Sequence, residues 1–517
     1  MTPPATVQFS LARDSLQAHE PAQALLRFQR RGYQRYVMLR EQIDLNFFWE
    51  RRWFFIAMIA GFLLIAAPTP ENLTHEGQIV LAMSIMATIL FVTEAVPLPT
   101  VPLLIIVGEV ILLGLDPTRV AQSLMTDSVL FIMGSLMLAV AIVKQRLDRR
   151  IAWLIVRMTG TNVYWISFGI TAVCGTLAAF IGEHTVAAMM LPVGVTFITL
   201  ISNEPKKVHG LAAVILFSIA YGCSIAGVAT PSGGARNAIM ISYWKEFFYD
   251  PLVPETRRFL VDYVSWSIYA FPMFLIRLPL VTFLLMMTFR PETTDMSRAV
   301  TRLRTQVMMD GPLKPAHWVT IFIFCLTILG WIFLSEQLGL GVIALIGVSA
   351  FLVFGLVKWE DINSGVNWGV VLLYAAAISL GVEMTETGAA DWVGRRFLTF
   401  LAELGADTGF GFNVAVSLLT IVVSNTMTAG AAVAVLGPIV LNTAGAAHVD
   451  PLIAGFVSAI SSAFGYLTPA AQPAFTIIYA SGYLKGKDFF KVGSRMMMLS
   501  VVILLALASF YWPLLGH

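Results

Sequence analysis

Apolar segments long enough to cross a lipid bilayer fill most of this 517-residue chain. Hydrophobic residues make up 57% of it and charged residues 12%, whereas soluble domains carry about 25% charged residues. A spanning helix needs about 20 apolar residues, and inside lipid every backbone polar group must be bonded internally. The sequence therefore predicts an all-α polytopic membrane protein.

The apolar segments form two sets with the same order, offset by about 240 residues. Each set contains spans, then an apolar hairpin interrupted by polar residues, then a span with a Gly/Pro break, then a final span. The predicted spans lie near 53–68, 77–96, 100–115, 127–145, 209–247 (broken), 262–288, 317–335, 339–357, 366–383, 452–482 (broken) and 491–515, and the hairpins near 163–201 and 409–443. With both hairpins re-entrant, the chain has about eleven transmembrane helices.

Basic residues set the expected orientation, because cytoplasmic loops of membrane proteins carry an excess of Lys and Arg. Eleven spans place every basic loop in the cytoplasm, the N-terminus inside and the C-terminus outside the cell (inner) membrane. Counting each hairpin as a full crossing instead puts Lys206, Lys207 and the central basic loop outside, so that reading is disfavoured. In the eleven-span reading each repeat holds five spans, an odd number, which predicts an inverted repeat.

The expected organisation has five parts: a cytoplasmic extension (1–52), a first span (53–76), a first repeat (77–289), a cytoplasmic linker (290–316) and a second repeat (317–517). The Arg-rich segment 25–45 is either solvated or an amphipathic helix on the membrane surface. A further amphipathic stretch is predicted at 148–159.

Two hairpin tips carry polar residues at membrane depth, Gly182-Glu183-His184-Thr185 and Ser424-Asn425-Thr426. A charged group there costs roughly 3 kcal/mol on insertion scales, so it usually marks a substrate or ion pathway. The breaks at 229–237 and 467–475 follow the tips in both halves. Free N–H groups at half-helix N-termini favour an anion, and carbonyls of unwound backbone favour a cation.

These motifs resemble the divalent anion/sodium symporter family, of the solute carrier family 13 type within the ion transporter superfamily. The resemblance rests on Thr93-Glu94-Ala95-Val96-Pro97, the Ser424-Asn425-Thr426 tip, Ala187-Ala188-Met189-Met190-Leu191-Pro192 and Ser481-Gly482 with Lys487-Asp488, and the layout covers roughly 53–515. It implies a secondary transporter of di- or tricarboxylates or sulfate, generally driven by sodium. It also implies a homodimer with scaffold domains and elevator-type transport domains.

The resemblance assigns candidate site residues to the tips and breaks. Substrate contacts are expected from Glu183, His184, Thr185, Arg236, Asn237, Asn425, Thr426, Gln472 and Pro473, and a second-half sodium site from Ser424, Asn425, Ala470 and Ala471. No cofactor beyond sodium is expected. The expected partners are a small anion, the bilayer and a second copy of the chain, and no nucleic acid.

The first half departs from the family pattern of Ser-Asn-Thr at both tips, since it has Glu183 and His184 instead, with Arg236 before Asn237. In the second half Pro473-Ala474-Phe475 stands where the family has asparagine. The leading hypothesis is a buried Glu183–Arg236 ion pair, with Arg236 as a fixed cation in place of sodium. Alternatively, Arg236 binds the substrate while Glu183 or His184 exchanges a proton, or the pair only ties the hairpin to the broken span.

Other readings of function remain open at this point. A sulfate, sulfonate or other organic-anion transporter that is proton-coupled, or a sodium-independent exchanger, is the alternative to a dicarboxylate transporter. An intramembrane enzyme is remote, because neither HExxH nor GxSxG is present, and a channel is disfavoured by the paired hairpins. Among the other charges, Glu109 is expected to pair in the dimer or face a cavity, and Arg277 to snorkel or pair.

Overall fold

The computed structural model describes residues 51–97, 99–145, 159–199, 207–297 and 314–515, and positions 49, 157, 201, 300, 301 and 305. The segment 25–45 and most of the amphipathic stretch 148–159 lie outside the described residues. Over these ranges the chain is all-α, as predicted, with no β-strand. Nine of the described helices are long and apolar enough to cross a membrane, and five shorter helices are also apolar.

The helices follow the two-set order read from the sequence. Those of the first set are α3 (Arg52–Ala66), α4 (His75–Thr93), α5 (Thr100–Ile111), α6 (Pro117–Ser123), α7 (Asp127–Lys144), α9 (Val163–Ile181), α10 (Glu183–Thr199), α11 (His209–Ala226), α12 (Ala235–Phe248) and α13 (Tyr263–Thr288). Those of the second set are α15 (Pro315–Leu338), α16 (Leu340–Val353), α17 (Trp359–Gly365), α18 (Trp368–Glu386), α19 (Ala389–Glu403), α20 (Gly409–Ser424), α21 (Ala429–Ala446), α22 (Pro451–Ser461), α23 (Pro473–Tyr479) and α24 (Gly486–Ala506).

Both hairpins and both broken spans form at the predicted places. The hairpins are α9–α10 and α20–α21, and each carries a proline inside its second arm, Pro192 and Pro438. The broken spans are α11–α12 and α22–α23, whose breaks contain the short 3-10 turns Pro231–Gly233 and Pro469–Ala471. Proline and glycine interrupt the helical hydrogen bonds at both breaks.

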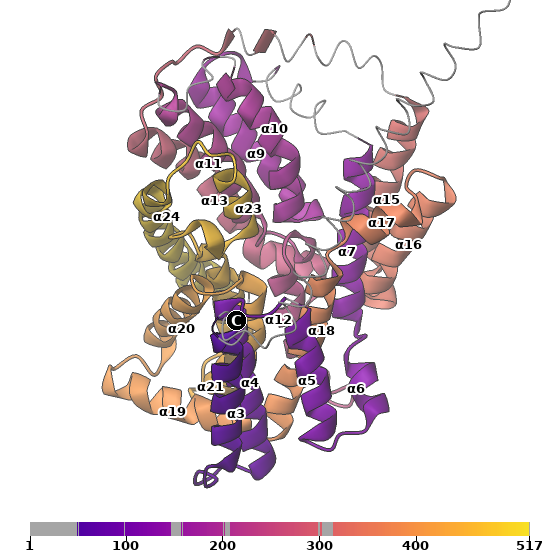
Figure 1. Cartoon of the computed structure of the whole chain (residues 1–517), viewed down its shortest axis with the longest axis vertical. Coiled ribbons are helices and arrows are strands. Elements are labelled where there is room, and N and C mark those ends of the chain that lie inside the picture. The colour runs from indigo at the N-terminus through magenta and orange to yellow at the C-terminus, as the bar shows by residue number, and fades with distance from the viewer. Residues whose placement is uncertain are drawn as a thin grey trace, which may run out of the picture.

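The two sets interlock at the centre of the molecule. Each hairpin packs on the broken span of its own half, α10 on α11 and α21 on α22, and also reaches the other half, since α10 contacts α23 and α12 contacts α21. Figure 1 shows α12 in the middle of the bundle, with α18 beside it and α7, α15 and α16 grouped at one side. This interlocking brings both breaks and both tips together.

Burial follows position in the bundle. The apolar window of α11 is 94% buried, whereas those of α15 and α24 are each 33% buried. Large apolar side chains of α15, such as Phe322 and Phe333, are exposed. Such a surface is stable against lipid tails rather than water, so α15 and α24 belong to the outside of the bundle.

Candidate functional site: a cavity at the meeting point of tips and breaks

A cavity of ≈ 220 Å³ lies where the hairpin tips meet the broken spans. Its lining includes the first residues of three helices: Glu183 and His184 of α10, Ala235 and Arg236 of α12, and Ala429 and Gly430 of α21. The free N–H groups of a helix N-terminus carry a partial positive charge. Three such ends directed to one cavity favour an anion inside it.

Gly182 makes the first tip. It ends α9 with φ +93° and ψ 143°, and α10 begins at the next residue. Only glycine adopts this conformation without strain. The break is therefore one residue long, whereas the second tip leaves the residues from Asn425 to Thr428 between its two helices.

The predicted Glu183–Arg236 ion pair is present at the edge of the cavity. Arg236 Nη1 lies 3.3 Å from Glu183 Oε1, and the side chains are 2% and 10% exposed. Arg236 Nε and Nη2 and Glu183 Oε2 have no hydrogen-bond partner among the described residues. Because buried polar groups are nearly always bonded, these atoms are available to a ligand or water in the cavity.

Three glycines make room for the guanidinium. A Cβ on Gly227 would lie 2.7 Å from Arg236 Nη2, and one on Gly234 would lie 3.0 Å from Arg236 Nη1. A Cβ on Gly233 would lie 2.8 Å from the Gly227 carbonyl oxygen. The break at 227–234 thus lets the backbone close around a planar cation.

Three carbonyl groups of the first break, and that of Ile225 at the end of α11, accept hydrogen bonds from protein side chains. Asn237 Nδ2 donates to the carbonyls of Gly227 (2.8 Å) and Thr230 (2.7 Å). Trp266 Nε1 donates to the Val228 carbonyl at 2.9 Å, and Arg277 Nη2 to the Ile225 carbonyl at 2.9 Å. Asn237 therefore holds the broken span together, and Arg277 is a fully buried structural cation rather than a snorkelling one.

The second break is held by a different amide. Gln472 Nε2 donates to the Ala463 carbonyl, and Gln472 Oε1 accepts from Ser224 Oγ of the first half at 2.6 Å. At the tip, Asn425 Oδ1 accepts from the Leu467 backbone N–H at 3.1 Å. A Cβ on Gly465 would lie 2.7 Å from the Ser424 carbonyl oxygen, so the tip and the unwound backbone approach closely.

The structure brings some of the predicted site residues into the cavity and places others beside it. Glu183, His184, Arg236 and Pro473 line it. Other predicted residues are not part of its lining: Thr185, Asn237, Ser424, Asn425, Thr426, Ala471 and Gln472. The side chain of Ala470 lies outside the described part of the structure.

Sequence reasoning missed several lining residues. Thr428 caps α21 by accepting from the Ala431 N–H, and a threonine before small residues is a usual N-cap signal. Tyr374 of α18 lies so close that a Cβ on Gly430 would come within 2.4 Å of its hydroxyl oxygen. Tyr374, Ser135 and Asn367 come from spans with no break, so no pattern in the chain distinguishes them.

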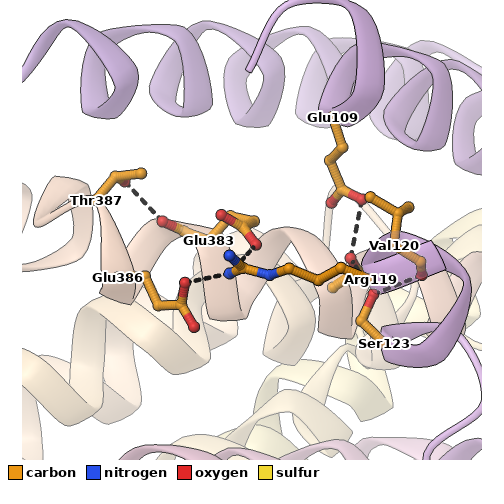
Figure 2. Close-up of polar contacts among 8 residues, drawn as sticks. Glu109, Arg119, Val120, Ser123, Glu383, Glu386 and Thr387 are labelled. Carbon is orange, nitrogen blue, oxygen red and sulfur yellow. Dashed lines mark hydrogen bonds and ion pairs between the residues drawn. The ribbon is translucent and has the colours of Figure 1, made fainter. Parts of the chain in front are cut away.

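A second polar cluster lies apart from the cavity, where α5, α6 and α18 meet (Figure 2). Arg119 Nη2 bonds Glu383 Oε1 at 3.1 Å and also bonds Glu386 Oε2. Glu109 is fully buried beside Ser379 and pairs within the chain. Among the described residues, no group of three or more His, Cys, Asp or Glu side chains has the arrangement of a metal site.

Comparisons with known proteins agree with this arrangement. Residues 49–517 match the family model described as the sodium:sulfate symporter transmembrane region. A sodium-dependent dicarboxylate transporter of Staphylococcus saprophyticus is 23% identical over 473 residues, covering 86% of this chain and 88% of its own. The sodium-dependent high-affinity dicarboxylate transporter 3 of Caenorhabditis elegans is 24% identical over 474 residues, covering 82% of each.

A solved structure shares the fold. The antimetabolite efflux pump MtrF of Neisseria gonorrhoeae superposes with a TM-score of 0.50 at 13% identity, covering 76% of this chain and 83% of its own. The match to the family model spans more than half of the chain. The protein is therefore a multi-pass membrane transporter and a member of the sodium:sulfate symporter family, the divalent anion/sodium symporters.

Proposed function

We propose that this chain is a secondary active transporter of small dicarboxylate anions. The observation that carries the proposal is the buried Arg236 guanidinium at a cavity that also receives three helix N-termini. Arg binds carboxylates through a planar fork of N–H donors. A cavity of ≈ 220 Å³ suits a small anion, since pockets for drug-sized ligands begin at about 300 Å³. Relatives named as dicarboxylate transporters support the same substrate class.

We further propose that sodium binds in the second half, and that Arg236 replaces the first-half cation. In the first break the carbonyls of Ile225, Gly227, Val228 and Thr230 already accept hydrogen bonds from protein donors. The guanidinium occupies the space beside them. In the second half the Ser424 carbonyl lies at the tip close to the unwound backbone at Gly465, which is typical of cation sites in broken helices.

The remaining features of the proposal follow the family resemblance. Two repeats, 77–289 and 317–517, form an inverted pair, and the transport domains move as elevators within a homodimer. The N-terminus lies in the cytoplasm and the C-terminus outside, as the basic loops favour.

Uptake of labelled succinate into proteoliposomes tests the proposal. We expect saturable uptake that sodium stimulates over choline, and that unlabelled internal succinate accelerates. Arg236→Gln should weaken apparent affinity about 10- to 100-fold, since hydrogen bonds to charged groups contribute about 1.5–3 kcal/mol. The matched control is Arg257→Gln, which breaks an exposed pair with Glu336 and should transport normally.

Other outcomes would redirect the assignment. Flux without trans-stimulation would indicate a channel. Equal uptake in sodium and choline would support the sodium-independent or proton-coupled alternative, and a sulfate or sulfonate that displaces succinate from the binding site would change the substrate class. Coupling to two or more sodium ions per cycle would contradict the fixed-cation role of Arg236.

A further inference from the structure

The polar cluster at the junction of α5, α6 and α18 contains a row of four oxygen atoms. Glu109 Oε2 lies 2.9 Å from Ser379 Oγ, which lies 2.8 Å from Ser123 Oγ, which lies 2.8 Å from the Val120 carbonyl oxygen. Figure 2 shows Glu109, Val120 and Ser123 of this row beside the Arg119 side chain. Each of these distances is that of an ordinary O–H···O hydrogen bond.

Counting hydrogens favours one protonation state for this row. Three contacts between oxygens need three hydrogens, and the two serine hydroxyls supply one each. The Val120 carbonyl has none to give. If Glu109 were ionised, Ser379 would donate to it, the single Ser123 hydrogen would go either to Ser379 or to the Val120 carbonyl, and one of the three contacts would have no hydrogen. A proton on Glu109 Oε2 completes the row, since each O–H then donates to the next oxygen.

The charges around Glu109 favour the same state. Glu109 is 0% exposed, and its Oε1 has no hydrogen-bond partner within the described parts of the chain. A buried carboxylate needs several donors, whereas a neutral acid leaves only a carbonyl oxygen without one. The nearby cation Arg119 of α6 is already shared by Glu383 and Glu386 of α18. From α4, Met83 packs against Gly108, next to Glu109.

We infer that Glu109 holds a proton and that the α5–α6–α18 junction is a proton-binding site separate from the substrate cavity. Release of the proton to water leaves a buried carboxylate and one hydrogen too few for the three contacts of the row. The row of hydrogen bonds that joins α5 to α18 and α6 then has one gap. Deprotonation therefore loosens this junction, and the proton acts as a ligand that holds three helices together.

Infrared spectroscopy of the full-length protein in nanodiscs tests the proton directly. A protonated carboxylic acid has a C=O stretching band separate from those of carboxylates. We expect this band at neutral pH in the wild type, its loss in Glu109→Gln, and its retention in the matched control Glu383→Gln. A wild-type spectrum without a band that Glu109→Gln removes would overturn the inference.

Thermal melts across pH provide a second measurement. The Gln side chain donates N–H to Ser379 as the protonated acid does, so Glu109→Gln should keep the wild-type Tm at neutral pH. At alkaline pH the wild type should lose several degrees that the variant retains. Parallel alkaline losses in both proteins would contradict the inference. If Glu109→Gln does not fold, Ser379→Ala should shift the position of the acid band, and an unshifted band would exclude the row.

Discussion

At the scale of single residues, the Glu183–Arg236 pair places two opposite charges at the lining of the cavity. Both side chains are buried, and each leaves polar atoms without a partner among the described residues. Removing one member of a buried pair leaves an uncompensated charge and costs about 3–5 kcal/mol, whereas removing both costs much less. An anion bound in the cavity can also compensate the charge of Arg236, because it can pair with the guanidinium.

Single and double neutralisation should therefore differ in stability. We expect Glu183→Gln and Arg236→Gln each to lose about 3–5 kcal/mol, and the double variant Glu183→Gln/Arg236→Gln to lose less than the sum of the two. Thermal melts in detergent, with and without succinate, measure this. Succinate should restore much of the Tm of Glu183→Gln but not that of Arg236→Gln. Additive losses would show that the two side chains act independently.

At the scale of elements, the breaks in helices set the position of the site. The sequence predicted both tips and both breaks, because polar residues, proline and glycine stand out within apolar runs. The hypothesis of the ion pair came from the family resemblance. The sequence could not predict the direction in which each amide points. Asn237 bonds the backbone of its own break, and Gln472 does the same from the position before Pro473. The second break has no asparagine equivalent to Asn237. Gln472, whose side chain is one methylene longer, bonds the backbone of that break instead.

The first tip depends on one glycine. Gly182→Ala should lower stability by about 1–3 kcal/mol, because φ +93° is strained for any residue with a Cβ, and it should impair succinate uptake by displacing Glu183. The matched control is Gly445→Ala in α21, where no atom lies within 4 Å of an added Cβ. There, alanine should be neutral or stabilising by up to about 1 kcal/mol. Equal effects at both sites would show that the tip is not strained.

At the scale of the whole molecule, ion pairs join corresponding helix ends of the two sets. Lys144 at the end of α7 bonds Asp361 of α17 at 2.5 Å, and Glu383 near the end of α18 bonds Arg119 of α6. The long helix carries the basic residue in the first half (Lys144 of α7) and the acidic residue in the second half (Glu383 of α18), and the short helix carries the opposite charge in each case. Repetition of the helix order was predictable from hydropathy, whereas these contacts join residues more than 200 positions apart and follow only from the packing.

The Lys144–Asp361 pair should contribute to stability in a pH-dependent way. Hydrogen bonds from Lys144 and from the Lys358 backbone lower the pKa of Asp361. Its contribution is therefore complete above the ordinary Asp pKa of about 3.9 and is lost as the pH falls through the lowered value. Asp361→Asn should reduce Tm by no more than a few degrees near neutral pH, and less in high salt. A difference from wild type that persists at the acid end would contradict this origin.

A guanidinium that is part of the chain has a consequence for how far the proposed transporter can concentrate its substrate. A sodium ion enters with each cycle and carries the energy of its gradient, whereas Arg236 returns with the protein and carries none. When one sodium ion fewer crosses the membrane in each cycle, the driving free energy falls by about 2.3 kcal/mol per 100 mV of membrane potential. A tenfold ratio of substrate concentrations across the membrane corresponds to about 1.4 kcal/mol. At about 100 mV the loss therefore lowers the attainable concentration ratio by about 40-fold. If Arg236 has the proposed role of a fixed cation, uptake is less dependent on the ion gradient and easier to reverse.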